Sequence, residues 1–177
     1  MTLGAAAVVG IGSMLAVGWH QNSRIGVAIH DSIVIKDEVE QINEMRLANA
    51  NMILAAMDTI IDRSEGQIQP ERVEIINAAV ALLSDGSRVL TAVAKEAGVP
   101  DEAKSYDEDL KTVVQAIQVD LKRMVETGAP DEDYAAIDDA IDGAGERLAA
   151  ALNNLSAAGG NLVEGYVNEA TNRSNQA

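Results

Sequence analysis

Three arginines and two asparagines are the side chains in this sequence best suited to hold a small anion. Arg46, Arg88 and Arg147 are far apart in the chain, with Asn49 close to the first and Asn153 close to the last. Arginine donates two parallel hydrogen bonds to a planar carboxylate and keeps its charge at physiological pH. If the fold brings these residues to one level, we expect a ligand site for a small molecule that carries a carboxylate.

Structural roles for the same residues stay open. Arg46 can instead pair with an acid such as Asp85 or Glu146 and fix the register of packed helices, a role that also fits Asn49. Arginines beside a helix seam usually extend to water, which is the alternative for Arg88 and Arg147.

Other kinds of chemistry are not indicated. The two histidines, His20 and His30, are ten residues apart and do not share a helix face as metal ligands require, and the chain has no cysteine. No phosphate loop, nucleophile elbow or dinucleotide fingerprint occurs. A net charge of −15 repels nucleic acid. We therefore expect neither an enzyme nor a cofactor, and no metal site or nucleic-acid partner.

The N-terminal stretch reads as a membrane anchor. Residues 3–19 carry no charge, and at about 1.5 Å per residue a helix of that length nearly crosses a hydrocarbon core of about 30 Å. Trp19 stands where interfacial aromatic residues concentrate, and no small-residue cleavage site follows. We expect residues 1–19 to form a transmembrane helix, shortened at its start because no basic residue precedes it. A buried Ala/Gly-rich helix of a soluble protein is the alternative.

The remainder divides into four helices. Pro70, Pro100 and Pro130 are the only prolines, and each lies beside turn residues between long stretches free of proline. We expect residues 20–177 to form one sensor-like domain, an all-α, antiparallel, up-down-up-down four-helix bundle. Its first helix is continuous with the transmembrane segment, and its first and fourth helices are the long ones. The predicted helices span about 20–62, 70–98, 101–128 and 130–177.

Apolar residues at alternating spacings of three and four mark a seam on each helix. The seam of the first helix is interrupted by Arg46 and Asn49. Antiparallel pairing of the first and fourth helices predicts that Trp19 faces Arg173, so both helices reach the membrane together. We expect a second transmembrane helix to follow Ala177. The predicted seams are Ile35, Val39, Ile42, Arg46, Asn49, Ile53, Ala56 and Ile60; Val73, Ile76, Val80, Leu83, Ser87, Leu90, Ala94 and Ala97; Leu110, Val113 or Val114, Ile117, Leu121 and Met124; and Tyr134, Ile137, Ile141, Ala144, Leu148, Ala151, Leu155, Ala158 and Leu162.

An apolar anchor that merges into a long helix with an arginine on its seam, followed by three more helices, resembles the ligand-binding domain of methyl-accepting chemotaxis receptors. The closest local match is residues 43–51, Asn-Glu-Met-Arg-Leu-Ala-Asn-Ala-Asn, which is similar to the family's first-helix stretch. There an arginine contacts ligand near the dimer interface, a position that Arg46 matches. The sequence departs from amino-acid-sensing members in offering one first-helix arginine rather than several.

The resemblance implies a function. It predicts a homodimeric chemoreceptor domain anchored in the inner membrane, with the sensor in the periplasm or extracellular space. A small organic acid or amino acid would bind near the dimer interface and shift the fourth helix, which passes the displacement across the membrane. Related bundles serve histidine kinases and diguanylate cyclases, and a ligand-free protein-interaction bundle is a further alternative.

Overall fold

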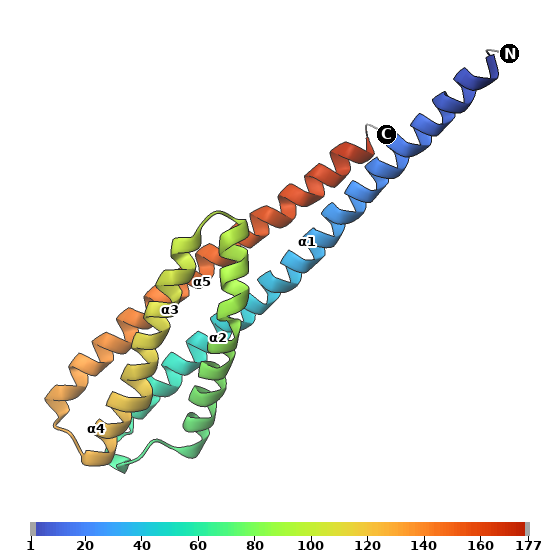
Figure 1. Ribbon diagram of the computed structural model, residues 1–177. Helices are drawn as coiled ribbons and strands as arrows, with labels where there is room; N and C mark the ends of the chain where they lie inside the picture. Colours follow the sequence, from blue (N-terminus) through green and yellow to red (C-terminus); the bar gives the residue numbers. More distant parts are fainter. Residues whose placement is uncertain (1–2, 176–177) are drawn as a thin grey trace. The chain divides into compact units, whose positions relative to one another are not determined.

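The computed structural model describes the backbone of residues 3–175 and the side chains of residues 26–27, 29–172 and 174–175. All regular elements in this described part are helical, and no strand occurs there. Four helices are present, because α3, η2 and α4 follow one another without a break (Figure 1). The elements are α1 (Leu3–Ile61), the 3-10 turn η1 (Arg63–Glu65), α2 (Pro70–Glu96), α3 (Pro100–Val114), the π-helix η2 (Gln115–Leu121), α4 (Lys122–Thr127) and α5 (Asp131–Ser174).

The helix boundaries follow the local sequence. Pro70 and Pro100 are the first residues of α2 and α3, where proline's missing N–H costs nothing. Gly66, Gly98 and Gly128 have φ values of 71°, 75° and 63°, a left-handed conformation that glycine adopts without a steric penalty. The predicted breaks between the helices are therefore present. The π-helix inside the third helix was not predicted.

The chain separates into two compact units. One contains residues 3–37 of α1 and residues 160–175 of α5 and its end, and the other spans Glu38–Gly159. This division does not coincide with the predicted boundary after residue 19. The side chains of residues 1–19, including Trp19, lie outside the described residues, and so does the side chain of Arg173.

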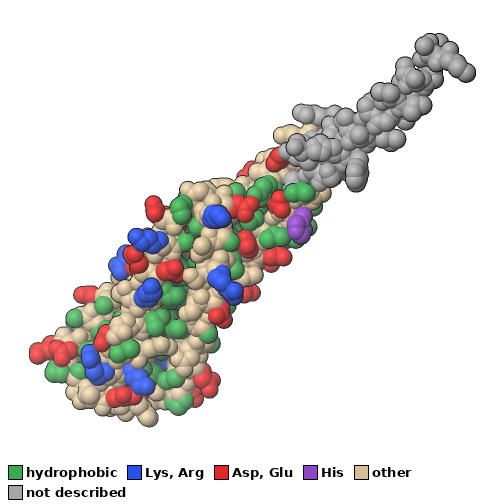
Figure 2. Space-filling view, viewed as in Figure 1, with side chains coloured by type: hydrophobic (Ala, Val, Ile, Leu, Met, Phe, Trp, Pro, Cys, Tyr) green, Lys and Arg blue, Asp and Glu red, His purple; other side chains and the backbone are tan. Residues whose placement is uncertain are grey.

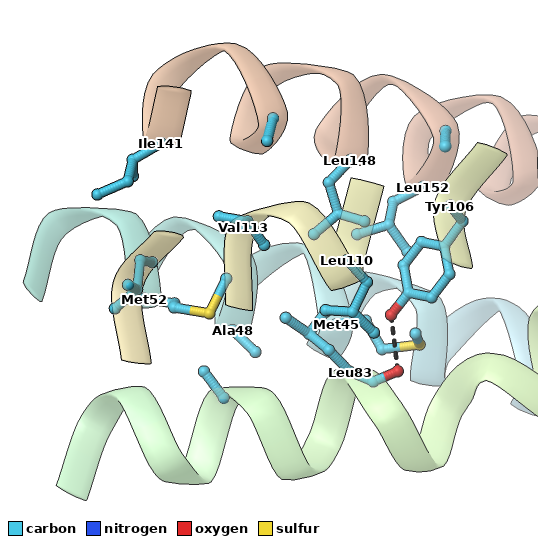
Figure 3. Close-up of a cluster of buried hydrophobic side chains, with 14 of the residues drawn as sticks. Met45, Ala48, Met52, Leu83, Tyr106, Leu110, Val113, Ile141, Leu148 and Leu152 are labelled. Atoms are coloured by element: carbon cyan, nitrogen blue, oxygen red, sulfur yellow. Dashed lines mark hydrogen bonds between the residues drawn. The ribbon is translucent and has the colours of Figure 1, made fainter. Parts of the chain in front are cut away.

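The unit Glu38–Gly159 holds the hydrophobic core, to which all four helices contribute. In Figure 3, Met45 of α1 lies beside Leu83 of α2 and Tyr106 of α3, and Met52 of α1 lies nearer to Val113 of α3. All five side chains are at most 1% exposed. Fully burying a side chain of this size contributes about 1.5–3 kcal/mol, so this cluster supplies much of the stability of the unit.

The seams predicted for the second and fourth helices agree largely with the buried residues. Ile76, Leu83 and Leu90 of α2 are buried, whereas Val73 is 38% exposed. On α5 every predicted residue from Tyr134 to Leu155 is buried. On the first helix the predicted seam is right at Ile35, Ile42, Asn49 and Ala56, which are buried, and wrong at Arg46, which is exposed. Met45 and Met52 take the core positions that were predicted for Arg46 and Ile53.

Charged side chains are dispersed over the surface. Figure 2 shows Lys and Arg interspersed among the more numerous Asp and Glu on the visible face, without a basic stripe. On this face the positive charges do not gather into a patch of the kind that binds a phosphate backbone.

Candidate functional site

Arg46 lies on the outside of α1. Its side chain is exposed, and Nη1 donates a hydrogen bond of 3.0 Å to Oδ1 of Asn43, one turn earlier on the same helix. The core position that the sequence assigned to Arg46 belongs to Met45, which is 1% exposed. The guanidinium group therefore faces away from the core of its own bundle, and most of its five N–H donors stay available.

Asn43 connects Arg46 to α5. Its Oδ1 also accepts a hydrogen bond of 3.4 Å from Oγ of Ser156. Asn153 is exposed and lies one turn before Ser156, just as Arg46 lies one turn after Asn43. We call these four residues the α1–α5 edge. The structure thus supports a common location for Arg46 and Asn153 and adds Asn43 and Ser156, whose only signal in the sequence is their spacing of three from the predicted residues.

Asn49 is in the core instead of on this edge. It is 4% exposed, and Nδ2 donates a hydrogen bond of 3.1 Å to the backbone carbonyl of Gly145 on α5. A Cβ atom at Gly145 would lie 2.7 Å from Cδ1 of Ile53, so the close approach of α1 and α5 depends on this glycine. Oδ1 of Asn49 is buried without a hydrogen-bond partner. These contacts assign Asn49 to helix packing.

Arg147 faces a different neighbour. Its Nε donates a 2.7 Å hydrogen bond to Oδ1 of Asp109 on α3, whose side chain is 15% exposed. Asn154 on the same side of α5 donates to Oε2 of Glu102, at 3.2 Å. Because this side of α5 packs toward α3 and the Gly145 side packs toward α1, Arg147 does not join the α1–α5 edge.

Arg88 is an exposed residue of α2. Arg46 donates to Asn43 on its own helix, and Arg147 donates to Asp109 on α3, so these two guanidinium groups have different neighbours.

The α1–α5 edge can bind an anion by hydrogen bonding. It offers one guanidinium group, two primary amides and a hydroxyl, a set of donors suited to a carboxylate. Among the described residues no group of three His, Cys, Asp or Glu side chains is placed to hold a metal ion. His30 is exposed, and the side chain of His20 lies outside the described residues.

The half-buried carboxyl group of Glu38 lies at the start of the unit Glu38–Gly159. Oε2 of Glu38 is buried without a hydrogen-bond partner. Burial raises the pKa of Glu38, and the negative charge of Glu96 raises it further. Both causes disfavour the ionised form, so Glu38 binds its proton more tightly than an exposed glutamate does.

An ion pair joins the turn η1, directly after α1, to the start of α5. Nε of Arg63 donates a 2.8 Å hydrogen bond to Oδ1 of Asp131, and its guanidinium carbon lies 5.3 Å from the ring centre of Tyr134. The Arg63 hydrogen bond lowers the pKa of Asp131. These contacts join the turn after α1 to the start of α5, and they pair Arg63 within the chain.

One helix of the described part is long and apolar enough to cross a membrane by length and composition, namely α2, Pro70–Glu96. Core helices of soluble proteins pass the same test, and α2 buries Ile76, Leu83 and Leu90 in the bundle. The predicted anchor at residues 1–19 lies outside the residues to which this criterion applies.

No family model, curated protein or solved structure matches the chain.

Proposed function

We propose that this chain is the sensory portion of a homodimeric membrane receptor, which binds a small carboxylate beside Arg46 and transmits a displacement of α5. The observation that carries the proposal is an apolar stripe on the outside of α1. Leu47, Leu54 and Ile61 are 64%, 61% and 70% exposed and are spaced by seven residues. Large apolar side chains with this repeat are typical of a helix that packs against a second helix.

A second copy of the chain is the occupant that fits this stripe. A stripe at heptad spacing is self-complementary across a two-fold axis, so each leucine meets its counterpart in the partner. Asn43 and Ala50 lie along the same face, and Arg46 flanks it. In such a dimer Arg46 lines the boundary between subunits, where two copies of the α1–α5 edge supply two guanidinium groups. The exposed position of Arg46 in one chain fits a ligand site completed by the other.

The proposed fold is an up-down-up-down bundle. Contacts between helices support it, because along each neighbouring pair the partner's residue number falls as the residue number rises. The supporting contacts are Asn49 to Gly145 and Arg63 to Asp131 for α1 and α5, Asn77 to Gln118 and Ser87 to Asp107 for α2 and α3, and Glu102 to Asn154 and Asp109 to Arg147 for α3 and α5.

We place residues 1–19 in the inner membrane and the bundle in the periplasm or extracellular space. The uncharged sequence of residues 3–19 supports the anchor, as does the continuity of α1 from Leu3 to Ile61. A ligand biases the receptor only by its different affinity for two packings of the helices, and about 1–3 kcal/mol is a typical coupling energy. Gly160 and Gly165 weaken α5 and make it the element that moves.

Cysteine cross-linking tests the dimer. The chain has no cysteine, so a single introduced thiol forms a disulfide only with a second copy. We expect Leu47→Cys and Leu54→Cys to give a covalent dimer of the full chain in membranes under mild oxidation. Leu82→Cys, on the exposed surface of α2, is the matched control and should stay monomeric. Equal cross-linking at Leu54 and Leu82 would reject the proposed interface.

A thermal-shift screen tests the ligand. We expect a dicarboxylate, tricarboxylate or aromatic acid to raise the melting temperature by several degrees, because a ligand that binds only the folded state stabilises it. Arg46→Ala should abolish the shift with little loss of fold, and Arg88→Ala should retain it. A shift that survives Arg46→Ala places the ligand elsewhere, and a screen without any shift favours a protein-interaction bundle.

A further inference from the structure

A groove that the sequence did not reveal lies between the start of α2 and the second half of the third helix. Its volume is about 500 Å³, within the range of about 300–1,000 Å³ that is usual for ligand pockets. None of the predicted arginines or asparagines lines it. We call it the α2–η2 groove; it is lined by Gln67, Ile68, Val73, Ile76, Asn77, Ile117, Gln118, Lys122 and Glu126.

The groove has an apolar floor and a polar rim. Ile76 and Ile117 are 3% and 0% exposed and form the floor together with the half-buried Ile68. At the rim, Nε2 of Gln118 donates a hydrogen bond of 3.0 Å to Oδ1 of Asn77 across the two helices. The remaining amide atoms of this pair are a donor on Asn77 and an acceptor on Gln118. A ligand with an apolar body and polar ends matches this distribution.

Two opposite charges stand side by side on the same rim. Nζ of Lys122 and Oε1 of Glu126 are 4.0 Å apart, too far for a hydrogen bond, and their side chains are 56% and 54% exposed. Such a loose pair on one helix contributes little stability, so both groups can turn toward a ligand at low cost. Together they match a molecule that carries both a carboxylate and an ammonium group.

The π-helix η2 accounts for the position of these side chains. Beyond Val113 the large core residues follow at intervals of four, Ile117, Leu121 and Val125, with the small Ala116 buried beside them, where a regular α-helical seam alternates three and four. The wider turn rotates the end of the third helix and places Gln118 and Lys122 toward α2. Short π segments are rare and occur frequently at functional sites.

We propose that the α2–η2 groove binds a small zwitterion with an aliphatic body, that is, a free aliphatic α-amino acid. Its carboxylate pairs with Lys122 and accepts from the amide of Asn77, its ammonium group pairs with Glu126, and its side chain covers Ile76 and Ile117. This site is separate from the α1–α5 edge and does not depend on a dimer.

Calorimetric titration of the full chain with L-valine, L-leucine and L-isoleucine tests the proposal. We expect at least one to bind saturably, and Lys122→Gln and Glu126→Gln each to weaken binding at least tenfold while the fold, checked by circular dichroism, is kept. Lys111→Gln, an exposed lysine of α3 that does not line the groove, is the matched control and should bind like the wild type.

The analogues of leucine that lack one charge separate the zwitterion from simpler ligands. 4-Methylpentanoate lacks the ammonium group and 3-methylbutylamine lacks the carboxylate, and we expect each to bind at least tenfold more weakly than leucine. If either analogue binds as tightly as leucine, the proposal is overturned. It is also overturned if none of the three amino acids binds. If Arg46→Ala loses leucine binding and Lys122→Gln keeps it, leucine binds at the α1–α5 edge, and the proposal is overturned as well.

Discussion

The hydroxyl of Tyr106 donates a hydrogen bond of 2.7 Å to the backbone carbonyl of Leu83, which ties α3 to α2 inside the core (Figure 3). Both side chains are 0% exposed. Burial raises the pKa of Tyr106, and the neighbouring charge of Asp107 adds to the effect. A phenol in this position stays protonated at pH values where an exposed tyrosine ionises, and this difference has consequences for stability.

The first prediction concerns the Tyr106 hydroxyl. We expect Tyr106→Phe to lower the free energy of unfolding by about 1 kcal/mol at neutral pH, the typical net value of a hydrogen bond. The pKa of Tyr106 is raised in the fold, so its stabilisation is full below about pH 10, where the unfolded phenol is neutral, and is lost as the pH rises further. Urea unfolding at pH 8 should show that the variant has a lower free energy of unfolding than the wild type. At pH 11 this difference should disappear. A deficit that is equal at both values would contradict the prediction.

The second prediction concerns Asn49, whose amide is only half satisfied in the core. Asn49→Leu removes the unpartnered oxygen and the donated hydrogen bond together, so we expect its unfolding free energy to stay within about 1 kcal/mol of the wild type or to exceed it. Asn49→Asp keeps the size, loses the donor and buries a charge, so we expect a loss of at least about 2 kcal/mol. Denaturant unfolding of both variants measures this. The reverse order would show that the Gly145 contact matters more than the unpaired oxygen.

The third prediction concerns Glu38, whose pKa is raised by burial and by Glu96. A raised pKa means that the fold favours the protonated form, so the stability contribution of Glu38 is full below its ordinary pKa of 4.5 and is lost as the pH rises through the folded value. We therefore expect Glu38→Gln to raise the melting temperature at pH 7 and to have little effect near pH 4. Glu44→Gln, at an exposed carboxylate on the same helix, is the control for the loss of one negative charge and should change the melting temperature at pH 7 less than Glu38→Gln does. A gain that is the same at pH 4 and pH 7 would assign it to packing.

The fourth prediction contrasts two glycines. A Cβ atom at Gly86 of α2 would overlap the thioether of Met45, which is 1% exposed, whereas nothing lies within 4 Å of one at Gly165 of α5. We expect Gly86→Ala to destabilise the bundle, because overpacking costs about 1–3 kcal/mol and exceeds the gain in helix propensity. Gly165→Ala should stabilise α5 by about 0.5–1 kcal/mol and slow hydrogen exchange of its amides. Stabilisation by Gly86→Ala would mean that Met45 moves aside without cost.

The position of Arg46 shows where prediction from the sequence failed. Within Glu38–Gly159, α1 carries apolar residues on two opposite faces, with Met45 and Met52 in the core and Leu47 and Leu54 outside. Helical periodicity identifies apolar stripes but does not fix the rotation of a helix to within one residue. The predicted seam therefore placed Ile42, Asn49 and Ala56 correctly in the core but put Arg46 in the place of Met45. The same feature that misplaced Arg46 points to the proposed dimer interface.

The sequence by itself determined the all-helical class, the breaks between the helices and the buried faces of α2 and α5. These depend on local chemistry, namely proline and glycine at the turns and one apolar stripe on each helix. Only the tertiary structure decided that Arg147 pairs with Asp109 instead of joining Arg46, and that η2 opens a groove beside Lys122. The rotation of each helix about its axis is set by the packing of all four together, and a pattern within one helix does not contain that information.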